Sequence, residues 1–307
     1  MNANIETTHR SYILITPAKN EELNIEKLIF SVMNQTLKPL LWLIIDDGST
    51  DSTPEIIHKA ELEHEWVTSI TLNEKPRDVH KHYVEICNNG FRNIIDIAAS
   101  RGLDFNYIGV VDADIILENT FFENLITEFE KNSSLGIASG AVTYIDENGN
   151  EEIEYVKNDE PVGAMRLWNI ECFNETNGYY SSYAPDSVSN VLALLNGWEV
   201  KLFYHIKAIH LRKTRTAEGV YNGYKLMAVS DYYRNYHPLF LILKSLSILI
   251  KRPLIGISYI HGLIYCISNH IEKIDDVGVK NYYYTKTLSD IKKIVFYSKS
   301  VSLGETN

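Results

Sequence analysis

The stretch that most constrains this chain is residues 107–116, YIGVVDADII. Its first five residues carry no charge and favour a strand, which is typical of a strand buried on both faces of a parallel sheet. Asp112 and Asp114 follow at once. Because alternate residues of an extended chain point the same way, we expect both carboxylates to face one point. Such hard oxygen ligands suit Mg²⁺ or Mn²⁺ accompanying a phosphate-bearing substrate, although Asp-rich strand ends also occur as solvated loops.

Two earlier segments repeat this pattern of a buried strand that ends in polar residues. Residues 12–16, YILIT, predict a strand that ends at Pro17 and Ala18, and residues 40–45, LLWLII, predict one that ends just before Asp47. Ligands of open parallel sheets bind beyond the carboxyl ends of the strands. We therefore expect all three strand ends to border one crevice.

Helices are expected after both of these strands. Asn20 is expected to cap a helix whose apolar positions recur through residues 25–33, with Glu21 placing negative charge in its first turn. Thr53 is expected to cap the next helix, ahead of Pro54. Each unit is thus a strand, a tight loop and a helix.

A polar segment, residues 73–82, follows a third predicted strand and contains Arg77. The planar guanidinium could clamp two phosphate oxygens, or it could belong to a solvated loop. Gly90 lies in the helix predicted next, and we interpret it as a position of close backbone approach.

Length and cysteine content limit the class of protein. The 307 residues suit one large α/β domain, alone or with an appendage. The first residues lack the pattern of a secretory signal, and Cys87, Cys172 and Cys266 have spacings that indicate neither a disulfide framework nor a zinc site. We therefore expect a cytoplasmic protein.

Charge is divided unevenly along the chain. Residues 1–200 carry 13 Lys and Arg against 33 Asp and Glu, a net charge of −20, whereas residues 201–307 carry 16 against 7, a net charge of +9. The first part offers no basic surface, so we expect no nucleic-acid partner. The second part is also rich in Ile, Leu and Tyr, which favours an anionic membrane surface as its contact.

Residues 239–250 and 254–267 predict two amphipathic helices separated at Pro253. No apolar run reaches the roughly 18 residues that a transmembrane helix needs. The helices could lie in a bilayer interface, which would place the protein at the cytoplasmic face of a membrane. They could equally be buried against the rest of the chain or against a second subunit.

Three motifs together resemble the glycosyltransferase family 2 enzymes of the GT-A fold. They are ITPAKNEE, IIDDGSTDST and VVDADI, and the likeness continues through PVGAMRLWNIECFNETNGYY and YAPDSVSNVLALLNGWEV. The resemblance implies an α/β GT-A fold, with a Rossmann-like, mostly parallel sheet flanked by helices and a helical C-terminal extension. We expect a catalytic domain over residues 1–235, with nucleotide-sugar binding in 1–115 and the acceptor side in 116–235, followed by a helical region over 236–307.

The resemblance implies roles for the residues at the strand ends. Pro17 and Ala18 would line the nucleotide base, and Asp47 would hydrogen-bond it. Asp112 would lie near the ribose and the metal, and Asp114 would coordinate Mn²⁺ or Mg²⁺ bound to the diphosphate.

Roles for two later residues follow from the same resemblance. Asp186 would be the catalytic base, although Pro185 replaces the first acid of the family's Glu-Asp pair, and the alternative role of Asp186 is the N-cap of a helix. His210 falls where some GT-A enzymes have a further metal ligand, and otherwise it would be a structural histidine. Trp168 and the pair Tyr179-Tyr180 could stack on a sugar or belong to the core.

Transfer of a glycosyl group accounts for these residue types. A departing nucleotide diphosphate needs a divalent cation and one or two arginines, for which Arg166, Arg212 and Arg77 are candidates, with Arg166 and Arg212 assigned to the diphosphate or the acceptor. The acceptor hydroxyl must lose a proton to one carboxylate. A single base with no second nucleophile predicts inversion at the anomeric carbon.

We therefore expect a metal-dependent inverting glycosyltransferase with a UDP- or GDP-type sugar donor and a glycan or lipid-linked acceptor. It would act in glycolipid, polysaccharide or glycoprotein glycan synthesis. One alternative is a sugar nucleotidyltransferase, which would need a glycine-rich loop that PAKNEE does not supply. Another is a degenerate relative that binds nucleotide without turnover, an alternative that Pro185 keeps open.

Overall fold

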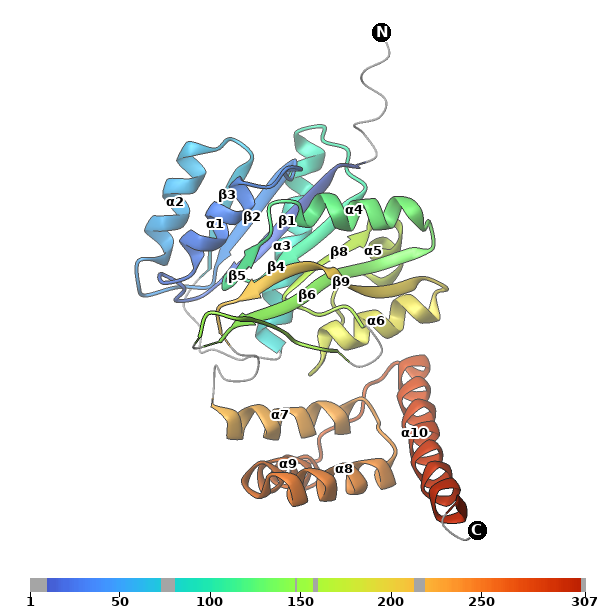
Figure 1. The fold of residues 1–307 in the computed structure, drawn as a ribbon. Coiled ribbons are helices and arrows are strands. Elements are labelled where there is room, and N and C mark those ends of the chain that lie inside the picture. The colour runs from blue at the N-terminus through green and yellow to red at the C-terminus, as the bar shows by residue number, and fades with distance from the viewer. Residues whose placement is uncertain (1–9, 73–80, 147, 157–159, 213–218, 305–307) are drawn as a thin grey trace. The chain divides into compact units, whose positions relative to one another are not determined.

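The computed structural model describes residues 10–72, 81–146, 148–156, 160–212 and 219–304. It divides into two compact units, Met1–Lys213 and Thr214–Asn307. The first unit contains the sheet, and the described part of the second is helical (Figure 1). The division falls before the helix Val220–Tyr233, so this helix joins the C-terminal helices and not the segment 1–235 expected as the catalytic domain.

One nine-stranded sheet runs through the described part of the first unit in the order β3-β2-β1-β4-β8-β6-β9-β5, with β7 paired to β6. Pairing is parallel from β3 to β4 and mixed beyond β4. The strands are β1 Tyr12–Ala18, β2 Leu41–Asp46, β3 Val67–Thr71, β4 Tyr107–Val111, β5 Ile115–Leu117, β6 Leu135–Ile145, β7 Glu151–Ile153, β8 Met165–Asn169 and β9 Glu199–His210.

Helices cover both faces of this sheet. Alternate residues of β1 point to opposite faces. Tyr12 and Leu14 belong to a core cluster that includes residues of α1, α2 and α4, whereas Ile13 and Ile15 belong to one that includes residues of α3, α5 and α6. The expected α/β architecture is therefore confirmed. The helices are α1 Ile25–Met33, α2 Thr53–Glu63, α3 Lys81–Ser100, α4 Phe121–Lys131, α5 Ile170–Thr176 and α6 Pro185–Leu195.

Gly90 lets α3 approach the sheet closely. A Cβ atom built at Gly90 would lie 2.3 Å from Cδ1 of Ile45 and 3.3 Å from Cδ1 of Ile15. Both isoleucines are fully buried, so a larger side chain would displace the core. The interpretation of Gly90 as a close-approach position is confirmed.

Both helix starts differ from the sequence-based expectation. Asn20 has a left-handed backbone (φ 53°), and its Oδ1 accepts a hydrogen bond from the Thr50 N–H (2.8 Å), so it joins two loops and does not cap α1. The N-cap of α1 is Asn24. The N-cap of α2 is Ser52, one residue before the expected Thr53.

The second unit consists of α7 Val220–Tyr233, α8 Pro238–Lys251, α9 Pro253–Ser268 and α10 Val277–Gly304. The predicted pair of helices with a break before Pro253 is confirmed by α8 and α9. Helix α9 packs against both α7 and α8. Among the described residues, no helix combines the length and the apolar character needed to cross a membrane.

Candidate functional site

The carboxyl ends of β1, β2 and β4 lie side by side, because β1 pairs in parallel with both neighbours. Ala18 is in register with Asp46, and the Asp47 N–H donates to the Ala18 carbonyl at 2.8 Å. Asp112 comes directly after β4. The structure therefore brings the three predicted strand ends to one edge of the sheet.

Asp47 is buried between two basic side chains. Its Oδ1 lies 2.8 Å from Nε2 of His82, and Lys19 Nζ lies 3.3 Å from its Oδ2 and donates to its carbonyl oxygen at 2.9 Å. Neither Lys19 nor His82 was predicted from the sequence to have a role in the site. Lys19 stands inside the ITPAKNEE motif, but the pairing of His82 with Asp47 depends on how the start of α3 packs. A nucleotide base that forms a hydrogen bond with Asp47 must share this carboxylate with Lys19 and His82 or replace them.

Asp46 closes the turn after β2. Its Oδ1 accepts a hydrogen bond from the Ser49 N–H at 3.0 Å. Its Oδ2 is buried and has no hydrogen-bond partner among the described residues. Asp46 is 1% exposed, so this oxygen is one of the few buried polar atoms that the described residues leave without a partner.

Asp112 is half-buried, and its Oδ1 accepts a hydrogen bond from the Tyr83 hydroxyl at 2.8 Å. Burial, followed by the nearby charge of Asp114, raises the pKa of Asp112 to about 7. Tyr83 was not anticipated, because its role depends on the packing of α3 against β4.

Asp114 is held by residues at the end of β9. Its Oδ2 lies 3.2 Å from Nε2 of His210 and accepts a hydrogen bond from Nε of Arg212 at 2.8 Å. Burial opposes ionisation, but His210 and Arg212 outweigh it and lower the pKa of Asp114. Burial likewise opposes protonation of His210, yet the Asp114 carboxylate raises the pKa of this imidazole.

Arg212 links Asp114 to a buried carboxylate that the sequence analysis left out of the site. Its second contact is an ion pair with Glu21. Glu21 also accepts a hydrogen bond from the side chain of Asn24 at 2.9 Å. Glu21 was interpreted only as a charge in a helix turn, although its position within ITPAKNEE could have indicated a role in the site.

The Asp114–His210 pair fits a divalent cation that arrives with a phosphate-bearing ligand. Mg²⁺ and Mn²⁺ commonly take one or two protein ligands and complete their coordination with phosphate oxygens and water. No set of three His, Cys, Asp or Glu side chains that could hold a metal by itself occurs in the described ranges. Because Arg212 occupies the same Oδ2, a cation bound there would displace or share this contact.

Asp186 lies in the first turn of α6, whose N-cap is Ala184. The alternative role of Asp186 as an N-cap is therefore wrong. Its carboxylate is half-buried, and within the described part of the chain it forms no hydrogen bond or ion pair. A Cβ atom built at Gly163 would lie 3.5 Å from its Oδ2. The carbonyl of the next residue, Ala164, accepts a hydrogen bond from the Asp112 N–H at 2.8 Å. Residues 163–164 are therefore neighbours of both Asp186 and Asp112.

Arg166 has a different role from the one expected. It is 0% exposed, and its guanidinium donates to the carbonyls of Pro161 (2.7 Å), Val162 (2.8 Å) and Asp186 (3.3 Å). A buried cation held by carbonyl dipoles in this way cannot also receive a diphosphate without leaving its place. The assignment of Arg166 to the diphosphate or the acceptor is therefore wrong for this conformation, and the residue positions the start of α6.

Trp168 and Tyr179 belong to the core. They are 0% and 2% exposed, and their rings meet edge to face at 5.3 Å. Of the alternatives for these aromatics, stacking on a sugar is therefore excluded here. Arg77, the third predicted phosphate partner, lies outside the described residues.

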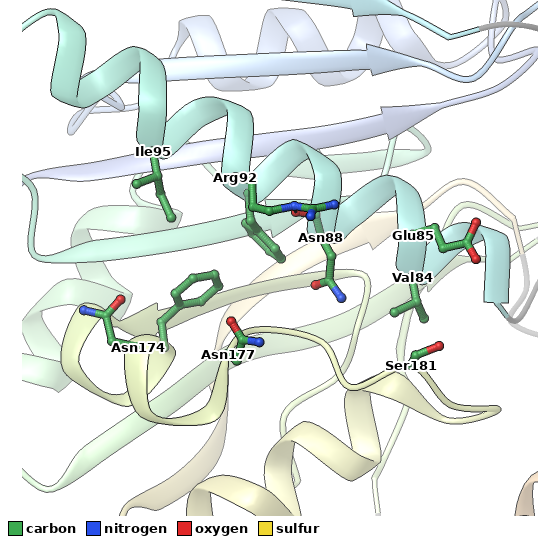
Figure 2. Close-up of a pocket in the computed structure, with 10 residues that line it drawn as sticks. Val84, Glu85, Asn88, Arg92, Ile95, Asn174, Asn177 and Ser181 are labelled. Carbon is green, nitrogen blue, oxygen red and sulfur yellow. The ribbon is translucent and has the colours of Figure 1, made fainter.

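A pocket of about 420 Å³ lies between α3 and the segment from α5 to residue 181 (Figure 2). Side chains of Asn88 and Asn177 project into it from facing walls, and Phe91 and Phe173 also line it. The Asn88 amide is fixed by hydrogen bonds with the backbone of Tyr179 (2.6 and 3.2 Å). The pocket thus combines amide groups with aromatic surface.

The mixed sheet, with paired aspartates beyond β4 and a carboxylate on α6, defines a transferase of the GT-A type. The chain belongs to glycosyl transferase family 2, since the model of that family matches residues 13–183, more than half of the chain.

Two of the similar proteins are named as synthases. The chain is 31% identical to the chondroitin synthase of Escherichia coli over 206 residues, which cover 63% of this chain and 27% of that protein. It is 25% identical over 122 residues to the poly-beta-1,6-N-acetyl-D-glucosamine synthase of Staphylococcus epidermidis, covering 39% and 26%. The chain thus spans about a quarter of the length of these relatives.

Two solved structures share the fold. The mannosyltransferase PcManGT from Pyrobaculum calidifontis, in complex with GDP-Man and Mn²⁺, has a TM-score of 0.50 at 14% identity, covering 95% of this chain and 82% of that one. S. aureus TarS 1-349 in complex with UDP has a TM-score of 0.50 at 15% identity, covering 72% and 65%. At these identities the likeness establishes the fold alone.

Proposed function

We propose that this protein is a metal-dependent, inverting glycosyltransferase that moves a sugar from a nucleotide-diphosphate donor to an acceptor hydroxyl. The observation that carries the proposal is the cluster of Asp114, His210 and Arg212 at the strand ends. Residues 163–164 lie beside Asp186 and are hydrogen-bonded to Asp112, and the Asp186 carboxylate has no partner among the described residues. Such a site can receive a charged leaving group and remove a proton from an attacking hydroxyl.

The donor would lie across the ends of β1, β2 and β4. Pro17, Ala18 and Asp47 would hold the base, and Asp112 would hold the ribose. A UDP or GDP donor is supported by the fold likeness to TarS with UDP and to PcManGT with GDP-Man.

Asp114 and His210 would hold Mn²⁺ or Mg²⁺ on the diphosphate. The bound cation supplies charge stabilisation for the departing nucleotide diphosphate. Arg212 lies beside Asp114, and its side chain is 36% exposed. Its guanidinium is therefore already in contact with solvent and can turn from the carboxylate to a phosphate oxygen.

Asp186 would act as the general base. Its carboxylate takes the proton of the acceptor hydroxyl while that oxygen bonds to the anomeric carbon, and the electrons of the breaking bond leave with the diphosphate. Arg166 fixes the Asp186 carbonyl and so orients the residue. Attack opposite the leaving group inverts the anomeric centre, and NMR of the product linkage checks this outcome.

The acceptor would be a glycan or a lipid-linked sugar in glycolipid, polysaccharide or glycoprotein glycan synthesis, made at the cytoplasmic face of a membrane. The pocket between α3 and α5 suits a hydroxyl-rich chain, because its amides can pair with hydroxyl groups and the charges of Glu85 and Arg92 balance. Replacement of Asn174 by Ala should raise the acceptor KM by about fivefold and leave donor binding unchanged.

Calorimetry of UDP and GDP, each with and without Mn²⁺, tests the donor site. We expect one nucleotide to bind the wild type only with metal, Asp114→Ala to abolish this binding, and Asp186→Asn to retain it while losing turnover. Binding that ignores both metal and Asp114 contradicts the proposed site. Metal-dependent binding without any transfer would instead support the second candidate, a non-catalytic nucleotide-binding relative, which Pro185 favours by replacing an acid.

A further inference from the structure

The C-terminal helical unit has a charged interior. Asp231 is 1% exposed, and its carboxylate accepts hydrogen bonds from Arg234 (2.9 Å), Lys244 (2.5 Å) and the Tyr259 hydroxyl (2.6 Å). Arg234 in turn stacks on the ring of Tyr236 at 4.9 Å. Polar groups from α7, α8 and α9 thus satisfy one another inside the unit.

The inner faces of these helices are also closely packed. A Cβ atom built at Gly262 of α9 would lie 2.3 Å from the Lys225 carbonyl oxygen of α7. One built at Gly256 would lie 2.3 Å from Cα of Leu249 in α8. At these two positions α9 therefore packs directly against the backbones of α8 and α7.

The outer faces are apolar. On α8, four exposed aliphatic side chains recur at helical spacing. On α9 four more are exposed, with the exposed His261 between the first two and the last two. The exposed fractions are Leu239 45%, Ile242 55%, Leu246 49% and Ile250 81% on α8, and Leu254 78%, Ile257 52%, Ile264 56% and Ile267 63% on α9. This unit therefore buries charges and exposes aliphatic side chains, the reverse of a protein surface made for water.

The charge around these faces indicates what covers them. Residues 238–268 contain no Asp or Glu. Lys251 and Arg252 are exposed at the junction of α8 and α9, directly between Ile250 and Leu254. Cations beside an apolar surface match the phosphates and acyl chains of an anionic bilayer. Helices of 14 and 16 residues span roughly 21 and 24 Å, which is less than the hydrocarbon core.

We propose that α8 and α9 form an interfacial anchor that lies in one leaflet of an anionic membrane. The junction between α8 and α9 inserts most deeply into the membrane. Ile250 and Leu254 lie below the headgroups, and Lys251 and Arg252 bind lipid phosphates. The network around Asp231 keeps the charges of Asp231, Arg234 and Lys244 among themselves and away from the acyl chains. The anchor goes beyond the proposed transfer reaction and does not depend on it.

Co-flotation of the full chain with vesicles tests this anchor in the absence of nucleotide. We expect binding to vesicles of phosphatidylcholine mixed with phosphatidylglycerol, and much weaker binding to phosphatidylcholine alone. The double variant Ile250→Ser/Leu254→Ser should lose about a hundredfold in partitioning, and Lys251→Gln/Arg252→Gln about thirtyfold. Leu62→Ser, which removes a side chain of matching exposure (74%) from the first unit, should bind like the wild type.

Two results would overturn the anchor. One is equal flotation of the wild type and of both double variants, with circular dichroism showing all of them folded. The other is absence of vesicle binding together with a dimer, measured by ultracentrifugation, that Ile250→Ser/Leu254→Ser dissociates, because a second copy would then cover the face. Metal-dependent nucleotide binding measured on the same proteins reports separately on the transferase site.

Discussion

Asp114 and Asp231 are both buried aspartates held by cations, but their arginine partners differ in exposure. The side chain of Arg212 beside Asp114 is 36% exposed, whereas that of Arg234 beside Asp231 is 11% exposed. A cation that is partly exposed can leave its carboxylate at lower cost, because water solvates the guanidinium and an incoming metal ion can neutralise the buried carboxylate. A buried one cannot, because separation leaves two unsolvated charges. The first pair therefore suits ligand exchange, and the second suits structure.

The largest effect should come from breaking the buried pair. Asp231→Ala leaves Arg234 and Lys244 without their carboxylate, and we expect a loss of about 3 to 5 kcal/mol in the free energy of unfolding. Chemical denaturation followed by circular dichroism measures it. Asp275→Ala, at an exposed position of the same unit, is the control and should change stability by less than about 0.5 kcal/mol. A loss of under 1 kcal/mol for Asp231→Ala would contradict the comparison.

Removal of the Asp114 carboxylate should lower the activity strongly and change the stability of the fold very little. Asp114→Ala should lower turnover by about a thousandfold, because the metal and the leaving group lose their ligand. Arg212 keeps its ion pair with Glu21 in this variant, so we expect the denaturation midpoint to stay near that of the wild type. Turnover within tenfold of the wild type would show that Asp114 does not serve the reaction.

Glu21 bears on the exchange at Asp114, because it is a second carboxylate with which Arg212 can remain paired when Arg212 leaves Asp114. Without this second partner, Arg212 stays on Asp114 and competes with the cation. Glu21→Gln should therefore weaken apparent Mn²⁺ affinity about threefold in the presence of nucleotide. Titration of Mn²⁺ measures the change, with Glu22→Gln as the neighbouring control at an exposed position. Equal Mn²⁺ affinity in Glu21→Gln and Glu22→Gln would exclude a role of Glu21 in this exchange.

The smallest effect concerns Lys273, a cation that forms no ion pair with a carboxylate among the residues that the structure describes. Burial lowers the pKa of Lys273 to about 8 from its ordinary 10.5. Between these values the unfolded chain binds a proton that the folded chain lacks, so this group makes stability rise with pH from about 8 to 10.5. Lys273→Met should flatten that rise by under about 1 kcal/mol, because the side chain is only half-buried. Denaturation across this pH range checks it, and Lys292→Met, an exposed lysine, should leave the slope unchanged.

The elements that the sequence could predict depend on local patterns. The uncharged run before Asp112 and Asp114 indicated a buried strand with carboxylates at its end, and β4 has those bounds. Pro253 indicated the break between α8 and α9, because proline lacks the N–H that a continuous helix needs. Neighbours along the chain suffice for such inferences.

Tertiary structure alone decided which partners these residues have. Arg212 reaches Asp114 across 98 residues and Glu21 across 191, distances along the chain that no local pattern reports. Arg166 is structural because segment 161–162 and α6 close over it. Helical periodicity likewise showed that α8 and α9 have two faces, but only the buried network around Asp231 decided that the apolar face is the outer one.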